Sequence, residues 1–242
     1  MDKVSVDVVI PCYNEEETLP ALFYKLEKVE DIIEQEGKYQ INFIFVNDGS
    51  RDKTLEILEQ KFKGAENVKI LVLEKNSGFG VALRTGLKET VSDFVVTIDA
   101  DTNYDQLEIP KILDYLTDDF DLVTASPFHP EGQWNFPLHR FITSRTVARM
   151  YKIALGKRYG SHLSTFTSGF RVYRGKILES IMPTAGDFLA TAQLLLNAVL
   201  KEYKVCEYPT VVYERKFGKS KLKTIQTIIS HLKFIYKVFR TR

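Results

Sequence analysis

Val95-Val96-Thr97-Ile98-Asp99-Ala100-Asp101 is an apolar run that ends in two carboxylates separated by one small residue. A short run of β-branched and apolar residues stopped by polar ones is typical of a buried strand. Carboxylates two residues apart on a strand share a face, and at its end the backbone can turn both toward one ion. Divalent cations that bridge phosphates use such sparse carboxylate sets. An isolated Asp-Ala-Asp is more often a solvated loop, so other motifs must distinguish the two readings.

The composition indicates a globular protein of one large domain, or one domain with an appendage. The chain has 242 residues, of which 44% are hydrophobic and 27% charged. A formal net charge of +1 provides no global field to recruit nucleic acid, and we expect no such partner. Cys12 and Cys206 fit no metal or redox spacing. With no signal peptide or bilayer-spanning run expected, we predict a cytoplasmic protein, soluble or peripheral on the cytoplasmic face of a membrane.

Strands alternate with helices through the first half of the chain. Strands are predicted over 6–10, 41–46, 68–73 and from 95, and helices begin near Thr18, near Ser50 and after Gly80. This alternation predicts an α/β fold with a mostly parallel sheet flanked by helices. In such sheets ligands bind outside the carboxyl ends of the strands.

Four polar loops therefore meet at one sheet edge, over residues 11–15, 47–50, 76–80 and 99–103. Each loop alone is more often a turn or a helix cap than a binding loop, and only their joint occurrence favours a nucleotide site. The first strand ends in Pro-Cys-Tyr-Asn-Glu, which disfavours a Rossmann dinucleotide site. The groups suited to a nucleotide are Tyr13, Glu15, Asp48, Gly78, Gly80 and Arg84.

The four loops, taken in order, resemble the motifs of glycosyltransferase family 2. The quoted segments are Val9-Ile10-Pro11-Cys12-Tyr13-Asn14-Glu15-Glu16, Val46-Asn47-Asp48-Gly49-Ser50, Asn76-Ser77-Gly78-Phe79-Gly80 and Asp99-Ala100-Asp101. Within the family the resemblance is to dolichyl- and polyprenyl-phosphate sugar synthases, which have the GT-A fold. It implies a nucleoside diphosphate sugar donor, GDP- or UDP-linked, and inversion at the anomeric carbon.

The same resemblance implies roles for individual residues. It puts Asp99 on the donor side and Asp101 on a Mg²⁺ or Mn²⁺ ion. Asn103 stands where some relatives have a glutamine ligand, so Asp99, Asp101 and Asn103 are the expected metal set. The residues expected around the nucleotide sugar are Pro11, Tyr13, Glu15, Asp48, Asn76, Gly78, Gly80, Arg84, Asp99, Arg215 and Lys221.

The second half is expected to receive the acceptor. A helix is predicted over 107–116, a strand over 121–125 and an irregular stretch over 126–137. Many lipid-phosphate relatives have an arginine after the serine that ends this strand, where the chain has Pro127 and Phe128. Arg140 matches an arginine that approaches the acceptor phosphate in relatives. With Arg145 and Arg149 it forms either a cationic ridge or a solvated helix face.

Three further segments bear on the acceptor. Ser168-Gly169-Phe170-Arg171 resembles the family segment that lines the acceptor cleft, with Ser168 and Arg171 as expected contacts. Asp187, before an apolar helix over 189–199, is either the base for a hydroxyl acceptor or a helix cap. A strand is predicted over 204–213, and Pro209 makes it an edge strand. It leads to a basic loop that resembles a family motif. Arg215, Ser220 and Lys221 of this loop are expected to contact the donor diphosphate or the acceptor phosphate.

From Lys221 to the end the chain carries six cations, no acid and apolar residues at helical spacing. This pattern predicts a basic amphipathic helix that either lies on an anionic membrane or packs on the domain. We expect a catalytic domain over 1–218, divided into a nucleotide half (1–103) and an acceptor half (104–218), with the helix over 219–242.

The sequence therefore predicts a metal-dependent inverting glycosyltransferase with a polyprenyl phosphate acceptor, in which Asp99, Asp101, Asp187 and Arg215 carry the chemistry. The alternative enzyme uses a hydroxyl acceptor with Asp187 as base. A non-catalytic sugar-nucleotide-binding module is the alternative from another class.

Overall fold

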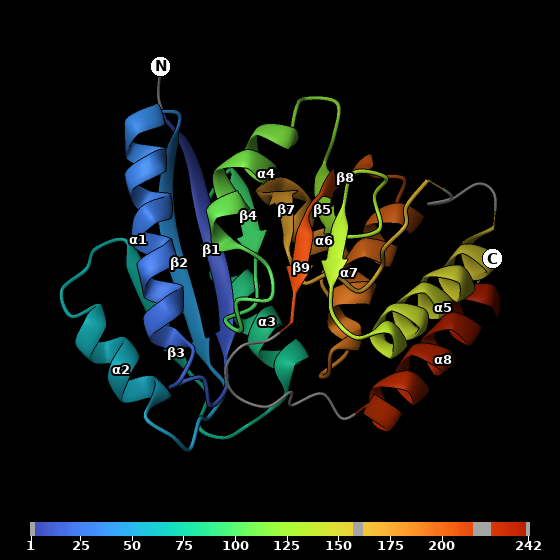
Figure 1. Ribbon diagram of the computed structural model, residues 1–242, viewed down its shortest axis with the longest axis horizontal. Helices are drawn as coiled ribbons and strands as arrows, with labels where there is room; N and C mark the ends of the chain where they lie inside the picture. Colours follow the sequence, from blue (N-terminus) through green and yellow to red (C-terminus); the bar gives the residue numbers. More distant parts are fainter. Residues whose placement is uncertain (1–2, 157–161, 215–223, 241–242) are drawn as a thin grey trace.

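A seven-stranded sheet in the order β3-β2-β1-β4-β7-β5-β8 forms the centre of the computed structural model, which describes residues 3–156, 162–214 and 224–240 (Figure 1). Neighbouring strands pair in parallel, except that β7 runs antiparallel to both β4 and β5. The strands are β1 (Val4–Cys12), β2 (Tyr39–Asn47), β3 (Val68–Val72), β4 (Phe94–Thr97), β5 (Leu122–Ser126), β7 (Arg171–Arg174) and β8 (Val205–Pro209). The predicted mostly parallel α/β sheet is confirmed.

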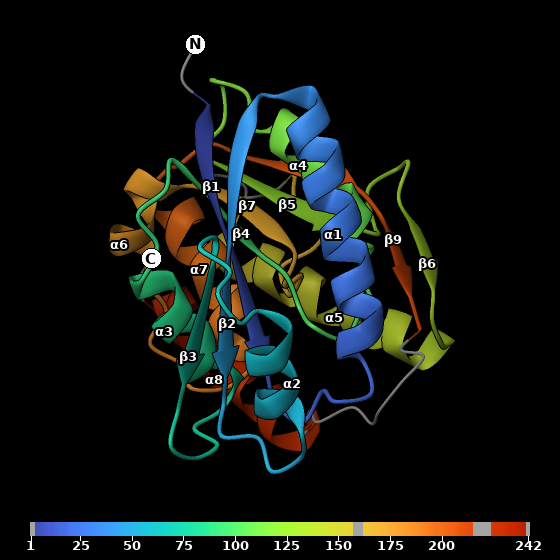
Figure 2. The ribbon, with the colours of Figure 1, turned by 90° about the vertical axis from the view of Figure 1, so that its left-hand side faces the viewer.

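Helices cover both faces of this sheet (Figure 2). In β1, Val8 and Ile10 belong to one apolar cluster and Val9 to the other, because successive side chains of a strand point to opposite faces. The first cluster includes residues of α1 (Leu19–Glu36), α2 (Thr54–Lys61) and α4 (Ile109–Tyr115). The second includes residues of α3 (Phe79–Lys88), α5 (Leu138–Leu155), α6 (Leu178–Ile181), α7 (Leu189–Leu200) and α8 (Thr224–Arg240). Two short 3-10 turns, η1 (Gln106–Glu108) and η2 (Gly175–Ile177), complete the helical elements of the described residues.

The second half of the chain differs from the prediction in two places. The single strand expected over 204–213 is divided at Thr210 into β8 and β9 (Val211–Tyr213). β9 leaves the large sheet and pairs with β6 (Gln133–Asn135), which lies inside the stretch expected to be irregular. β8 is an edge strand, as Pro209 predicted, because proline cannot donate to a further strand.

The C-terminal helix α8 packs against α5 and contributes Val238 to the core. Between the two helices, the Tyr151 hydroxyl and His231 Nδ1 form a buried hydrogen bond of 2.6 Å. Of the two placements left open by the sequence, packing on the domain is therefore observed. The expected boundary at residue 218 lies outside the described residues, and none of the described helices is both long and apolar enough to cross a bilayer.

Candidate active site

The loops that follow β1 and β2 are tied together by side chain to backbone hydrogen bonds. The backbone N–H of Asn14 donates to Ser50 Oγ (2.9 Å), and the N–H of Arg51 donates to Asn14 Oδ1 (2.7 Å). The N–H of Glu15 donates to Thr54 Oγ1 (2.7 Å) at the start of α2. The first loop is therefore held against the second loop and against the helix that follows it. An open hollow of about 520 Å³ adjoins these loops and is lined by Glu15 and Arg51 among others. Tyr13 and Glu15 are thereby placed at the predicted edge.

Asp48 ties the second loop to the third. Its carboxylate accepts hydrogen bonds from the backbone N–H of Ser77 (2.7 Å) and of Gly78 (2.9 Å), and the residue is buried. Burial raises the pKa of Asp48, while the two backbone donors lower it. Gly49, at a φ of 60°, lies so close to the backbone of Lys75 that no side chain would fit. Asp48 is therefore at the predicted edge, but its two oxygens hold the loop over residues 76–80.

This third loop rests on the segment before α7. The N–H of Gly80 donates to the carbonyl of Gly186 (2.9 Å). Arg84 donates to the carbonyls of Pro183 (3.2 Å) and Ala185 (3.3 Å), so its guanidinium supports this segment. Asp187 Oδ1 accepts the N–H of Leu189 (3.1 Å) at the start of α7. The N-cap of α7 is Phe188, so Asp187 stands one residue before the predicted cap position and its contact belongs to the turn that leads into the helix.

The segment from Asp99 to Asn103, here called the metal motif, contains a buried hydrogen-bond acceptor without a partner. Asp101 accepts from the N–H (3.2 Å) and the side-chain Nδ2 (2.7 Å) of Asn103. Asn103 Oδ1 is buried and has no hydrogen-bond partner, and Thr102 at a φ of 55° turns the chain sharply between them. A cation next to Asp101 would satisfy this oxygen. The described residues contain no group of three or more His, Cys, Asp and Glu side chains that could hold a metal ion. One or two carboxylates with an amide oxygen are a donor set suited to an ion that also binds water and substrate.

Tyr104 is a residue that the sequence did not single out. Burial raises the pKa of Tyr104 to about 12, so its hydroxyl stays protonated at neutral pH. Ser168 and the charges of Asp99, Arg171 and Arg140 also influence that pKa, in decreasing order. Tyr104 therefore links the segment around Ser168, predicted from a separate motif, to Asp99. An aromatic residue directly after Asn103 carries no recognisable signal in the sequence.

Arg171 is placed differently from the prediction. It has no exposed surface and donates to Thr124 Oγ1 (3.1 Å), to the carbonyl of Phe166 (3.0 Å) and to the carbonyl of Thr191. Each of its three nitrogens donates within the fold, to acceptors from three different segments, and the guanidinium is fully buried. We therefore leave Arg171 out of the acceptor site.

The basic loop lies mostly outside the described residues, including the predicted Arg215, Ser220 and Lys221. The point at which the chain enters it is defined. At the end of β9 the N–H of Tyr213 donates to the carbonyl of Asn103 (2.9 Å). Tyr213, near the end of the described residues before the basic loop, thus lies beside Asn103.

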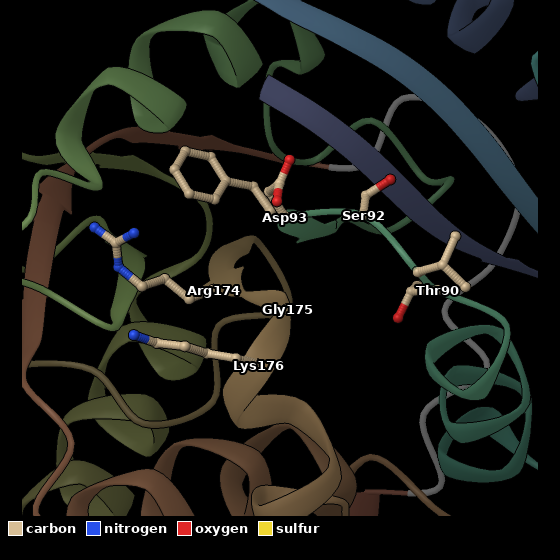
Figure 3. Close-up of a pocket in the computed structure, with 8 residues that line it drawn as sticks. Thr90, Ser92, Asp93, Arg174, Gly175 and Lys176 are labelled. Carbon is tan, nitrogen blue, oxygen red and sulfur yellow. The ribbon is translucent and has the colours of Figure 1, made fainter. Parts of the chain in front are cut away.

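A second hollow, of about 400 Å³, lies at the opposite end of β4 (Figure 3). Its lining includes Ser92, Asp93, Arg174 and Lys176. Asp93 accepts from Ser5, and Arg174 donates to the carbonyls of Thr117 and Phe120, so these groups are committed to the fold. This hollow is not part of the candidate active site.

The loops that follow β1, β2 and β4 thus lie at the carboxyl edge of a mostly parallel sheet, which is where open α/β proteins bind their ligands. Residues 7–182 match the description "Glycosyl transferase family 2", and the chain belongs to this family. The family predicted from the four motifs is confirmed.

Two relatives are 30% identical to the chain. The dolichol-phosphate mannosyltransferase of Pyrococcus furiosus matches over 98% of this chain and 64% of its own length. The undecaprenyl-phosphate 4-deoxy-4-formamido-L-arabinose transferase of Pectobacterium carotovorum subsp. carotovorum matches over 94% of this chain and 65% of its own length. The chain thus spans just under two thirds of these relatives.

Solved structures support the GT-A fold. Glucosyl-3-phosphoglycerate synthase from Mycobacterium tuberculosis, in complex with Mn²⁺, UDP and glucosyl-3-phosphoglycerate, gives a TM-score of 0.65 at 19% identity, over 98% of this chain and 79% of that one. A mannosyltransferase from Pyrobaculum calidifontis in complex with GDP-Man and Mn²⁺ gives 0.65 at 17% identity, over 98% and 65%.

Proposed function

We propose that the protein is a metal-dependent inverting glycosyltransferase that moves a sugar from a nucleoside diphosphate sugar to a polyprenyl phosphate. The observation that carries the proposal is the buried, unpartnered Asn103 Oδ1 beside Asp101, at the edge where the nucleotide loops meet. Mg²⁺ or Mn²⁺ held by Asp99, Asp101 and Asn103 would bind the donor diphosphate and stabilise its departure. Arg215 and Lys221 remain predicted to neutralise the same leaving group.

An anionic acceptor is favoured by the arginines that face this edge. Arg140 is exposed and lies close to Tyr104. Arg145 lies over the ring of Phe128, with its guanidinium carbon 5.5 Å from the ring centroid. Phe128, in the turn after β5, stands where many lipid-phosphate relatives have an arginine, and its ring holds the guanidinium of Arg145 from α5 near that position. The two related transferases are both named for polyprenyl-type phosphates.

The hydroxyl-acceptor alternative depends on Asp187. Its carboxylate already accepts the N–H of Leu189, and the charge of Asp187 influences the buried Tyr151 and His231. These contacts favour a structural role in the turn before α7. A phosphate acceptor is already ionised and needs no base, which is consistent with that role.

We also propose that α5 and α8 together contact an anionic membrane on its cytoplasmic face. Neither helix contains an acid, and several large apolar side chains are exposed on both. The exposed apolar residues are Leu138, Ile142, Ile153, Ile229, Leu232, Tyr236 and Phe239, and the exposed cations are Arg140, Arg145, Arg149, Lys233, Lys237 and Arg240. Each cation near such a surface contributes about 1 kcal/mol. A lipid acceptor would be reached from this face.

Radiolabelled UDP- and GDP-sugars, incubated with the protein, Mn²⁺ and a polyprenyl phosphate, test the function. We expect label in the organic phase that depends on both the lipid phosphate and the metal. Turnover with label confined to the aqueous phase would contradict the lipid acceptor, and transfer that continues in EDTA would contradict the metal.

Co-sedimentation with vesicles containing phosphatidylserine tests the membrane contact. Phe239→Ser is expected to lower the partition coefficient about tenfold, because burying a phenylalanine side chain contributes about 1.5–3 kcal/mol. Tyr24→Ser is the matched control, since Tyr24 is as exposed (62% against 61%) but lies on α1. Equal effects of both substitutions would rule out a specific α5 and α8 face.

A further inference from the structure

The antiparallel direction of β7 brings its beginning to the end of β4. The pairing register places Thr97, the last residue of β4, opposite Arg171, the first residue of β7. Residues 168–170, which lead into β7, therefore lie beside Asp99, which follows β4 two residues later. If β7 ran parallel to β4, the C-terminal end of β7 would lie at this place instead.

Two contacts join Thr97 to Asp99 through Gly169. The Thr97 hydroxyl donates to the carbonyl of Gly169 (2.8 Å), and Thr97 is buried. A side chain on Gly169 would begin only 2.9 and 3.0 Å from the two carboxylate oxygens of Asp99. The Asp99 carboxylate therefore lies directly against the Cα of Gly169. The Asp99 carbonyl also accepts a hydrogen bond from Gln106 Nε2 (3.4 Å).

We propose that Thr97 is a positioning residue for the donor and metal side of the site. Its hydroxyl holds Gly169 at the distance that orients the Asp99 carboxylate. Valine has nearly the same shape as threonine and would fill this place in the strand equally well. A buried threonine hydroxyl needs a hydrogen-bond partner, and here that partner is the Gly169 carbonyl. The segment over 168–171 then serves the metal side as well as the acceptor side. This role of Thr97 rests on the proposed function in one respect, namely that Asp99 binds the donor or the metal.

Thr97→Val and Thr97→Ser form the matched pair that tests this assignment. Valine removes the hydrogen bond and keeps the shape, whereas serine keeps the hydroxyl. Binding is followed by the thermal shift of each variant in a Mn²⁺ titration, at a fixed concentration of UDP or GDP, whichever stabilises the wild type more. We expect Thr97→Val to need about tenfold more Mn²⁺, and Thr97→Ser to stay within about twofold of the wild type.

The unliganded melting temperature and circular dichroism of each variant separate positioning from unfolding. A Thr97→Val protein that binds Mn²⁺ as the wild type does would overturn the assignment, and so would equal losses in both variants. Failure of the proposed function looks different, because the wild type itself would then show no metal-dependent stabilisation with either nucleotide.

Discussion

Replacing Asp101 with asparagine is expected to lower kcat/KM for sugar transfer about a thousandfold. A divalent ion that stabilises a departing diphosphate contributes several kcal/mol, and each 1.36 kcal/mol is a factor of ten in rate. The loss should be accompanied by the disappearance of the Mn²⁺-induced thermal shift with the nucleotide. The two oxygens of Asp101 accept from the backbone N–H and the side-chain Nδ2 of Asn103, so asparagine at position 101 would also place its own amide nitrogen against one of these donors.

Asp105→Asn is the control for this substitution. Asp105 lies in the same loop, where it accepts the N–H of Leu107 and pairs with Lys25. Asparagine caps helical turns as well as aspartate does, so this variant should keep its activity within a few-fold. Full metal-dependent turnover by Asp101→Asn, measured with an EDTA-treated blank, would place the metal elsewhere.

Replacing Arg171 with leucine is expected to destabilise the protein by about 3 kcal/mol. The substitution leaves Thr124 Oγ1 and the carbonyls of Phe166 and Thr191 without their common donor. Each buried acceptor left unsatisfied costs about 1–3 kcal/mol, partly recovered by relaxation. For a chain of this size the melting temperature should fall by about 6–12 °C.

Arg140→Leu provides the contrast, because Arg140 is exposed and its guanidinium carbon lies 5.1 Å from the ring centroid of Phe136. We expect it to raise the KM for the lipid phosphate about tenfold with a melting temperature within about 2 °C of the wild type. An Arg171→Leu protein of unchanged stability but weakened acceptor binding would return Arg171 to the acceptor site, as the family resemblance first implied.

The first hundred residues show how far pattern alone reaches. The predicted strands overlap β1 to β4, because long apolar runs between turn residues leave few alternatives, although β1 continues through Pro11 and Cys12, which were expected in the loop. Both glycines of the predicted loop over 76–80, Gly78 and Gly80, lie where no side chain would fit. The convergence of four loops followed from the parallel direction of these strands.

The acceptor half was less predictable because its contacts come from distant segments. β7 has four residues and an arginine at each end, so it lacks the apolar run that marks a strand. The burial of Arg171 depends on carbonyls from two other segments. Likewise, the partnership of Arg145 with Phe128 joins α5 to the loop before β6.

For the stretch ending in Asp99-Ala100-Asp101, the sequence established a strand, two carboxylates and their place at a sheet edge, since these depend on local pattern and strand direction. The tertiary structure determined what surrounds them. The antiparallel entry of β7 sets Gly169 against Asp99, and the turn at Thr102 leaves Asn103 Oδ1 unpartnered beside Asp101. The contact of Gly169 with Asp99 arises only when residues about 70 positions apart are brought together by folding, and the unpartnered Asn103 Oδ1 depends on the burial of the turn.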